Sequence, residues 1–299
     1  YTVYKSSAAS DVYKRQGCAR TLAAHGAVAA PDATRCPAEA GCLAPCPGHG
    51  ARSAELAAGE ARIWYLGHSG YAVQTRNTQL VFDYFAGGRD RDTPCVRNGH
   101  LDPAEIPGLP VTVFVSHEHN DHFDPAIFSW ADQVPRIRYV MGCAAETEHE
   151  CEHPEPRTVS HYGDITVRTI ASNDSGLGYL VQCDGVTIFH AGDHANRQRD
   201  FSGPYAAEID WLARMGAHPD IALMPVTGCG FGDQEAVRLG VHYALEKLRP
   251  KVFIPMHGLN NEWRYREFVD DCRNDFAPIR MVAPTQRGDH YDYRDGGIG

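Results

Sequence analysis

The chain has 299 residues and is 43% hydrophobic, which is enough for one large domain or two small ones with a sizeable core. Its formal net charge of −10 at pH 7, with histidine neutral, argues against nucleic acid as the main partner. No apolar run approaches the length of a membrane span, so we expect no membrane partner. Its 16 histidines, several of them clustered, favour metal binding without placing a site.

The ten cysteines are scattered along the chain, and no CxxC pair occurs. In a chain of this length, that distribution favours free thiols in a reducing compartment over a disulfide framework. No signal-peptide pattern is found either. We therefore expect a cytoplasmic protein with free thiols.

Residues 1–60 differ in composition from the rest of the chain. The sequence DVYKRQ at residues 11–16 matches the translation of a sequencing-library adapter, so we interpret residues 1–16 as an assembly artefact. Residues 17–60 are rich in Ala, Gly, Pro and Cys and show no sustained period, which is typical of a disordered or spuriously translated leader. We place the folded domain at residues 61–299.

Short apolar runs dominate the first half of this domain. An antiparallel meander is predicted first, and a loop over residues 86–110 follows it. Asp124 as N-cap and Pro125 at the first helical position predict a helix over residues 124–134. The predicted strands are 61–66, 71–75, 78–84, 111–116 and 136–142.

The second half alternates strands with amphipathic helices. The dipeptide Asp184–Gly185 lies between two runs and predicts a hairpin. Strands are expected at 164–170, 177–182, 186–192, 220–226, 251–257 and 279–284, and helices at 204–216, 234–248 and 262–272. The chain begins with strand hairpins and continues with strands that alternate with helices. This order predicts two sheets with helices outside them.

Four polar clusters follow apolar strands, at the positions where layered folds build their sites. They are GHSG (67–70), SHEHNDH (116–122), HAGD (190–193) and PMHG (255–258). Four clusters in the same structural context are harder to attribute to chance than one.

The second cluster has the clearest chemistry. His117 and His119 are two residues apart and can face one ion, while Asp121 and His122 can serve a second ion nearby. Imidazole and carboxylate are good ligands for Zn²⁺ and acceptable ones for Mn²⁺. A binuclear site also needs a bridging carboxylate, for which Asp193 is the candidate. Further along the chain, His257 can complete the second ion's ligands.

The sequence HEHNDH resembles the HxHxDH signature of the metallo-β-lactamase superfamily. The accompanying GHSG, VFDYF, HAGDH and PMHG resemble the branch that includes L-ascorbate-6-phosphate lactonase. The resemblance covers about residues 61–290. It implies an α/β (α+β) fold, the four-layer αβ/βα sandwich called the metallo-β-lactamase fold.

The resemblance also implies roles for individual residues. His117 and His119 would bind metal one, Asp193 would bridge, and the ligands of metal two would be Asp121, His122 and His257. Asp121 would double as a proton donor or acceptor, and His68 would lie in the pocket near the metals or the substrate. Asp83 is expected to orient a ligand rather than to bind metal.

One departure from the superfamily pattern concerns metal one. A third His usually comes from a loop that corresponds to ASNDSG, residues 171–176, and that loop has none here. Asp174 or Asn173 could replace it, which would favour Mn²⁺ or weaken the site for Zn²⁺. His149, His153 and His161 are possible substitutes, but they precede the next strand and are expected to point elsewhere.

The function expected from these residues is a metal-dependent hydrolase in which a metal-bound hydroxide attacks a small lactone, ester or phosphoester. The alternatives are a nuclease of the same superfamily, a diiron protein on this fold, and a non-catalytic metal- or ligand-binding module. The acidic charge argues against the nuclease, and His119 stands where the diiron branch carries Glu. We expect a small-molecule substrate, and the oligomeric state is left open.

Overall fold

The protein is described by a computed structural model covering residues 55–87, 94–106, 108–228 and 230–299. The leader predicted for residues 1–60 therefore lies almost entirely outside the described residues. All described residues belong to the unit Cys46–Gly299. The Gly59 backbone N–H donates to the Asp184 carbonyl at 2.8 Å, so the described fold already includes residues just before Ala61.

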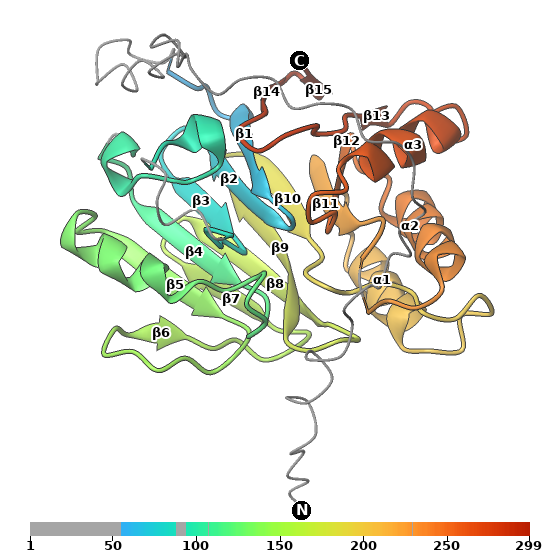
Figure 1. Ribbon diagram of the computed structural model, residues 1–299, viewed down its shortest axis with the longest axis horizontal. Helices are drawn as coiled ribbons and strands as arrows, with labels where there is room; N and C mark the ends of the chain where they lie inside the picture. The colour runs from blue at the N-terminus through green and yellow to red at the C-terminus, as the bar shows by residue number, and fades with distance from the viewer. Residues whose placement is uncertain (1–54, 88–93, 107, 229) are drawn as a thin grey trace, which may run out of the picture. The chain divides into compact units, whose positions relative to one another are not determined.

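The first sheet has eight strands in the described residues, in the order β15-β14-β1-β2-β3-β4-β5-β6 (Figure 1). Strands β1, β2 and β3 form the predicted antiparallel meander, and β3, β4 and β5 are parallel to one another. The strands are β1 (Ala61–Gly67), β2 (Gly70–Gln74), β3 (Gln79–Phe82), β4 (Val111–Val115), β5 (Ile137–Met141), β6 (Cys151–Glu152), β14 (His290–Arg294) and β15 (Gly297–Ile298).

The second sheet has seven strands in the described residues, in the order β13-β12-β11-β10-β9-β8-β7. The hairpin predicted from Asp184–Gly185 joins β9 and β10, with both turn residues at positive φ, 50° and 81°. The next three strands, β10 to β12, are parallel. The strands are β7 (Val159–Tyr162), β8 (Ile165–Ala171), β9 (Leu177–Cys183), β10 (Val186–His190), β11 (Ile221–Pro225), β12 (Val252–Met256) and β13 (Arg280–Met281).

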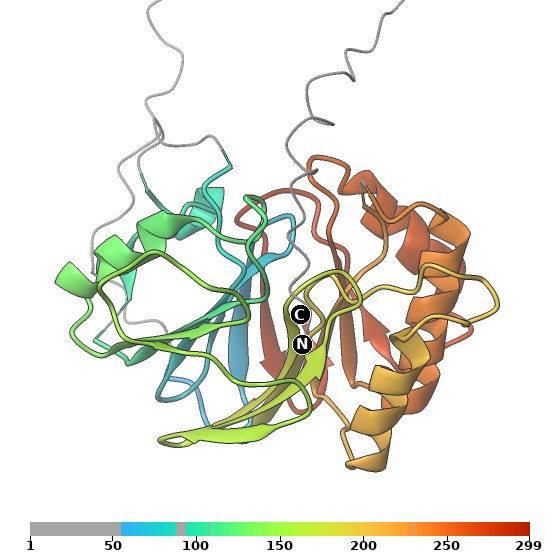
Figure 2. The same cartoon turned by 90° about the horizontal axis from the view of Figure 1, so that it is seen from below.

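Helices cover the outer faces of both sheets. On the second sheet these are α1 (Tyr205–Arg214), α2 (Gln234–Leu248) and α3 (Trp263–Cys272), all three predicted (Figure 2). The first sheet carries 3₁₀ segments instead, η1 (Val96–Asn98), η2 (Pro103–Glu105) and η3 (Pro125–Asp132). The sandwich of two sheets between outer helices confirms the expected fold class. None of the helices in the described ranges is long and apolar enough to cross a membrane.

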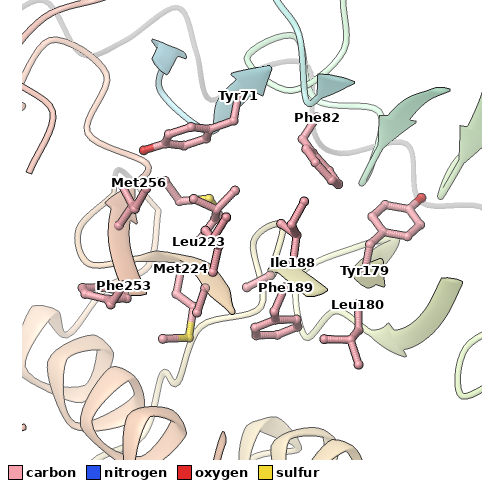
Figure 3. Close-up of a cluster of buried hydrophobic side chains, with 14 of the residues drawn as sticks. Tyr71, Phe82, Tyr179, Leu180, Ile188, Phe189, Leu223, Met224, Phe253 and Met256 are labelled. Carbon is pink, nitrogen blue, oxygen red and sulfur yellow. The ribbon is translucent and has the colours of Figure 1, made fainter. Parts of the chain in front are cut away.

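The core between the sheets is aromatic on both sides. Figure 3 shows Tyr71 and Phe82 of the first sheet facing Tyr179, Ile188 and Leu223 of the second. Two buried hydroxyls also join the layers, since Tyr71 donates to the Pro255 carbonyl and Tyr179 to the Val115 carbonyl, each at 2.8 Å. A second core lies under η3 on the outer face of the first sheet. Strand β4 is therefore buried on both faces, as its uninterrupted apolar run predicts.

Several expectations need correction. The helix predicted over 124–134 is a 3₁₀ segment, because it is short and Ile127, Phe128 and Trp130 are fixed against the sheet. The strand predicted at 279–284 is limited to β13, and β14 follows it to pair with β1. Strands β6, β7, β14 and β15 were missed because they are short, polar or half exposed. Cys95 is disulfide-bonded, so the expectation of free thiols is wrong there, while Cys143, Cys151, Cys183 and Cys272 are free.

Candidate metal centre

The polar clusters meet because their strands are parallel and end at the same edge of each sheet. Asp83 follows β3 and His117 follows the adjacent β4, while Asp193 follows β10 and His257 follows β12 in the facing sheet. The carboxyl ends of parallel strands share an edge, so side chains far apart in sequence lie together there. These four side chains are buried, and His117 and His122 have 0% exposure.

The first ligand group consists of His117, His119, Asp174 and Asp193, whose ligand atoms all lie within 4.8 Å of one another. His117 Nε2 is 2.9 Å from His119 Nδ1 and 3.7 Å from Asp193 Oδ2. On the open side, His119 Nδ1 is 3.8 Å from Asp174 Oδ2. Two imidazoles and two carboxylates can supply four donors to one divalent ion.

The second ligand group consists of His68, Asp121, His122 and His257, again within 4.8 Å of one another. His68 Nε2 is 3.3 Å from Asp121 Oδ2, and the rings of His68 and His257 are 4.1 Å apart. Sequence reasoning placed His68 in the pocket near the metals or the substrate, and the structure puts its ring among the atoms that could hold the second ion.

Asp193 lies between the two groups. Its Oδ1 is 3.2 Å from His122 Nε2, its Oδ2 is 3.7 Å from His117 Nε2, and both oxygens are 3.1 Å from His257 Nε2. The carboxylate is thus within reach of both groups, as a bridging ligand must be.

Several of these ligand atoms are buried and lack a hydrogen-bond partner, which favours a bound cation. Within the described residues, His68 Nδ1 and Nε2, His122 Nε2 and Asp193 Oδ1 are buried without a hydrogen bond, although some are only 3.1–3.3 Å from neighbouring donor atoms. Buried polar atoms are seldom left unpaired, and binding a metal ion is one way to satisfy them. This orphaned set is what a metal centre would satisfy.

The electrostatics also favour positive charge here. Burial by itself would raise the pKa of Asp193, but His122 and His257 hold that pKa well below its usual range. Against the effect of burial, Asp193 and Asp83 raise the pKa of His122 well above normal, because its ring lies between two carboxylates. The pKa of His68 falls to about 4, chiefly through burial, which leaves that ring neutral and able to donate a lone pair.

Several groups outside the ligand set fix the rings. Asp83 Oδ2 is 2.7 Å from His122 Nδ1, and Ser116 donates its backbone N–H and its hydroxyl to the same carboxylate, both at 2.7 Å. The Thr227 carbonyl lies 3.0 Å from His257 Nδ1. Holding Nδ1 in this way leaves each Nε2 directed into the site. This agrees with the expectation that Asp83 orients a ligand.

Three neighbouring residues carried no sequence signal that we recognised. Arg197 donates from Nη2 to Asp174 Oδ1 at 3.0 Å, and its guanidinium lies 5.4 Å from the centre of the Phe231 ring. Phe231 stacks on His257 with ring centres 4.4 Å apart. Phe85 packs its ring against His68 at 6.0 Å. An aromatic residue in a glycine-rich loop gives no indication of its partner until the loop is folded.

Five further histidines of the described residues are placed elsewhere. His149 stacks on Phe128 under the first sheet, and His161 contacts Thr166 at 3.2 Å. Together with the exposed His153, they are outside both ligand groups, as expected. His190 and His194 are buried beside the site and bond the carbonyls of Ser69 and Tyr205.

Comparison with known proteins defines the family. A family model for the beta-lactamase superfamily domain matches residues 62–257. A UPF0173 metal-dependent hydrolase of Opitutus terrae is 27% identical over 253 residues, covering 75% of this chain and 98% of the relative. Another, from Pyrococcus furiosus, is 36% identical over 218 residues, covering 68% and 85%. The chain belongs to the beta-lactamase superfamily and, within it, to the UPF0173 metal-dependent hydrolases.

Solved structures agree on the fold. Igni18, a metallo hydrolase of Ignicoccus hospitalis, has a TM-score of 0.57 at 17% identity, covering 79% of this chain and 99% of its own. CmlA, a diiron beta-hydroxylase of Streptomyces venezuelae, has a TM-score of 0.55 at 10% identity, covering 78% and 54%. The family model and the relatives confirm the superfamily expected from the sequence and a metal-dependent hydrolase. The branch resembling L-ascorbate-6-phosphate lactonase stays a prediction.

Proposed function

We propose that this hydrolase holds two divalent ions, one on each ligand group with Asp193 shared, and cleaves a small lactone, ester or phosphoester. The observation that carries the proposal is the position of Asp193, whose carboxylate lies 3.7 Å from His117 of the first group and 3.1–3.2 Å from His257 and His122 of the second. A single ion would not need both groups of ligand atoms, each of which is compact enough to hold one ion.

The donor sets differ in ways that bear on the metal. In the second group, three imidazoles and one carboxylate suit Zn²⁺, whereas the first group has two of each and is more tolerant of Mn²⁺. Bound at these positions, divalent ions supply Lewis acidity and make hydroxide available near neutral pH. We therefore take Zn²⁺ as the main cofactor and Mn²⁺ as an alternative for the first group.

Asp121 is our candidate for proton transfer. Its side chain is 31% exposed, so it can reach both the second group and solvent. Burial opposes ionisation, but the neighbouring His68 and His122 keep the pKa of Asp121 below its usual range. A carboxylate that stays ionised can accept a proton from water and pass it to the leaving group. The neutral His68 ring lies beside this carboxylate, with Nε2 3.3 Å from Asp121 Oδ2.

The test is metal content together with turnover of the full-length chain. Purified without a histidine tag or chelator, it should contain close to two zinc or manganese ions by plasma mass spectrometry. The protein should also hydrolyse at least one member of a panel of aryl esters, lactones and phosphodiesters. One ion or fewer after metal is added back would contradict the binuclear site.

His119→Ala separates the metal centre from the fold. The His119 side chain is 53% exposed, so its removal leaves little cavity and the chain should fold normally. We expect loss of the ion in the first group and a fall in turnover of roughly 100-fold or more, because stabilisation of the developing charge is lost. The matched control is His153→Ala, an exposed histidine outside both groups, which should keep both ions. Equal turnover in the two variants would overturn the assignment.

A further inference from the structure

We infer that Arg197 is the positioning residue of the first ligand group: it holds one oxygen of Asp174 so that the other faces His119. This rests on the proposed binuclear function and adds to it the residue that makes an aspartate work where the superfamily usually has a histidine. The central observation is that Arg197 Nη2 lies 3.0 Å from Asp174 Oδ1, while Asp174 Oδ2 lies 3.8 Å from His119 Nδ1.

The backbone of Asp174 is fixed independently of Arg197. Asn173 pairs with Ala195 through both side-chain atoms, accepting from its N–H at 3.0 Å and donating to its carbonyl at 2.6 Å. The Asn173 N–H also donates to His194 Nδ1 at 3.3 Å. The loop of Asp174 is therefore tied to the loop of Asp193 and Arg197, and only the Asp174 side chain is left to be oriented.

Arg197 is itself held. Its side chain is 28% exposed, its guanidinium lies over the Phe231 ring at 5.4 Å, and that ring stacks on His257. A stacked guanidinium keeps a fixed plane and loses little freedom when it binds a carboxylate. The chain of contacts His257–Phe231–Arg197–Asp174 thus runs from a ligand of the second group to a ligand of the first.

The charge balance explains why an arginine belongs here. Replacing a neutral imidazole by a carboxylate adds one negative charge to the ligand group. The positive charge of the guanidinium beside Asp174 compensates for it. With Oδ1 occupied by Arg197, the free donor of Asp174 is Oδ2, which allows this residue one metal contact rather than two.

The direction in which metal affinity changes when Arg197 is removed distinguishes a positioning role from a purely electrostatic one. A cation near a metal site repels the metal, so by charge alone its removal would tighten binding. A positioning residue acts the other way, because removal lets the partly exposed Asp174 side chain turn away, and loss of such orienting partners typically weakens metal binding about 10- to 100-fold.

The experiment titrates Zn²⁺ into the chelator-stripped full-length protein against a chromophoric chelator. The wild type should show two binding steps, and the step lost in His119→Ala identifies the first group. Arg197→Met should weaken that step about 10- to 100-fold and leave the other nearly unchanged. Arg197→Lys, which keeps the charge and one donor, should have an affinity between those of the wild type and Arg197→Met. Circular dichroism of the metal-free variants should match the wild type.

Two controls make the result decisive. Arg199→Met removes the same charge from the same loop, but Arg199 pairs with the exposed Asp233, so both steps should persist. In an Asp174→Asn background, Arg197→Met should cause no further weakening, since Arg197 acts through the carboxylate.

Three outcomes would overturn the inference. They are tighter binding in Arg197→Met, an equal loss of affinity in the Asp174→Asn background, and unchanged affinity with only a raised KM. Fewer than two steps in the wild type would instead refute the proposed binuclear function.

Discussion

Three residues of the site adopt backbone conformations that their side chains disfavour. His68, Asp83 and His257 have positive φ angles of 54°, 43° and 72°. Non-glycine residues in this region cost about 1–3 kcal/mol each, and they persist only where the surroundings enforce them. Here Gly258 and His257 are held by bonds to the Tyr265 hydroxyl at 2.6 Å and to the His68 carbonyl at 3.0 Å. Part of the folding free energy therefore maintains side-chain direction at the metal centre.

Asp83→Asn tests the orientation of His122. Asparagine can still accept from the Ser116 N–H, but its amide would then face His122 Nδ1 as a donor. The ring would have to carry its proton on Nε2, the nitrogen that faces Asp193, and could not offer that atom to a metal. We expect affinity for the second ion to fall about 10- to 100-fold in a chelator competition.

A matched control for Asp83→Asn is Asp220→Asn. Asp220 is also buried and accepts from Thr187 and Tyr293, but it lies at the start of β11, away from the ligand groups. The Asp220→Asn variant should be less stable than the wild type but should bind metal with unchanged affinity. Unchanged metal affinity in Asp83→Asn would show that Asp83 serves only the fold.

At the scale of elements, the N-cap predicted for η3 is confirmed although the predicted type of helix is wrong. Asp124 caps it as predicted, accepting from the Ala126 N–H at 2.9 Å. Its other oxygen accepts from the Ala86 N–H at 3.0 Å and so ties η3 to the segment after β3. The cap is a local property that the sequence can specify, whereas the 3₁₀ geometry follows from packing against the first sheet.

Asp124→Ala should therefore destabilise the metal-free protein by about 1–2 kcal/mol, measured by urea unfolding, because both bonds are lost and helix caps are worth about this much. Asp132→Ala, at the exposed opposite end of η3, should change stability by less than about 0.5 kcal/mol. Equal losses in the two variants would show that the cap contributes nothing specific.

At the scale of the whole described fold, each sheet supplies part of the metal centre. The first sheet carries His68, Asp83 and the residues from His117 to His122, while the second carries Asp174, Asp193 and His257. Neither sheet has a complete set for either ion if Asp193 is shared. Bound metal should therefore tie the two sheets together.

Removal of metal should then lower thermal stability. At a free metal concentration 100 times Kd, one ion stabilises the folded state by about 2.7 kcal/mol. For a domain of this size that corresponds to a fall in Tm of about 5–10 °C when the ion is removed by EDTA. Scanning calorimetry with and without EDTA, followed by re-addition of zinc, measures the shift. An identical Tm in all three samples would mean that the metal, if bound, does not join the sheets.

The sequence determined the local features and the kind of chemistry. Apolar runs, caps and the Asp184–Gly185 turn depend on neighbours along the chain, so most strands and all three α-helices could be predicted. The HxHxDH spacing places four donors within six residues, which is why the candidate metal centre could be expected without a structure.

Only the tertiary structure decided how the donors are shared and what holds them. His68 joins the second group because the β1–β2 turn lies beside His257, and the interactions of Arg197 and Phe231 depend on loops that meet across the second sheet. The polar strand β14 likewise becomes a strand by pairing with β1. These contacts join residues far apart in sequence, and their free energy exists only once the two sheets have packed together.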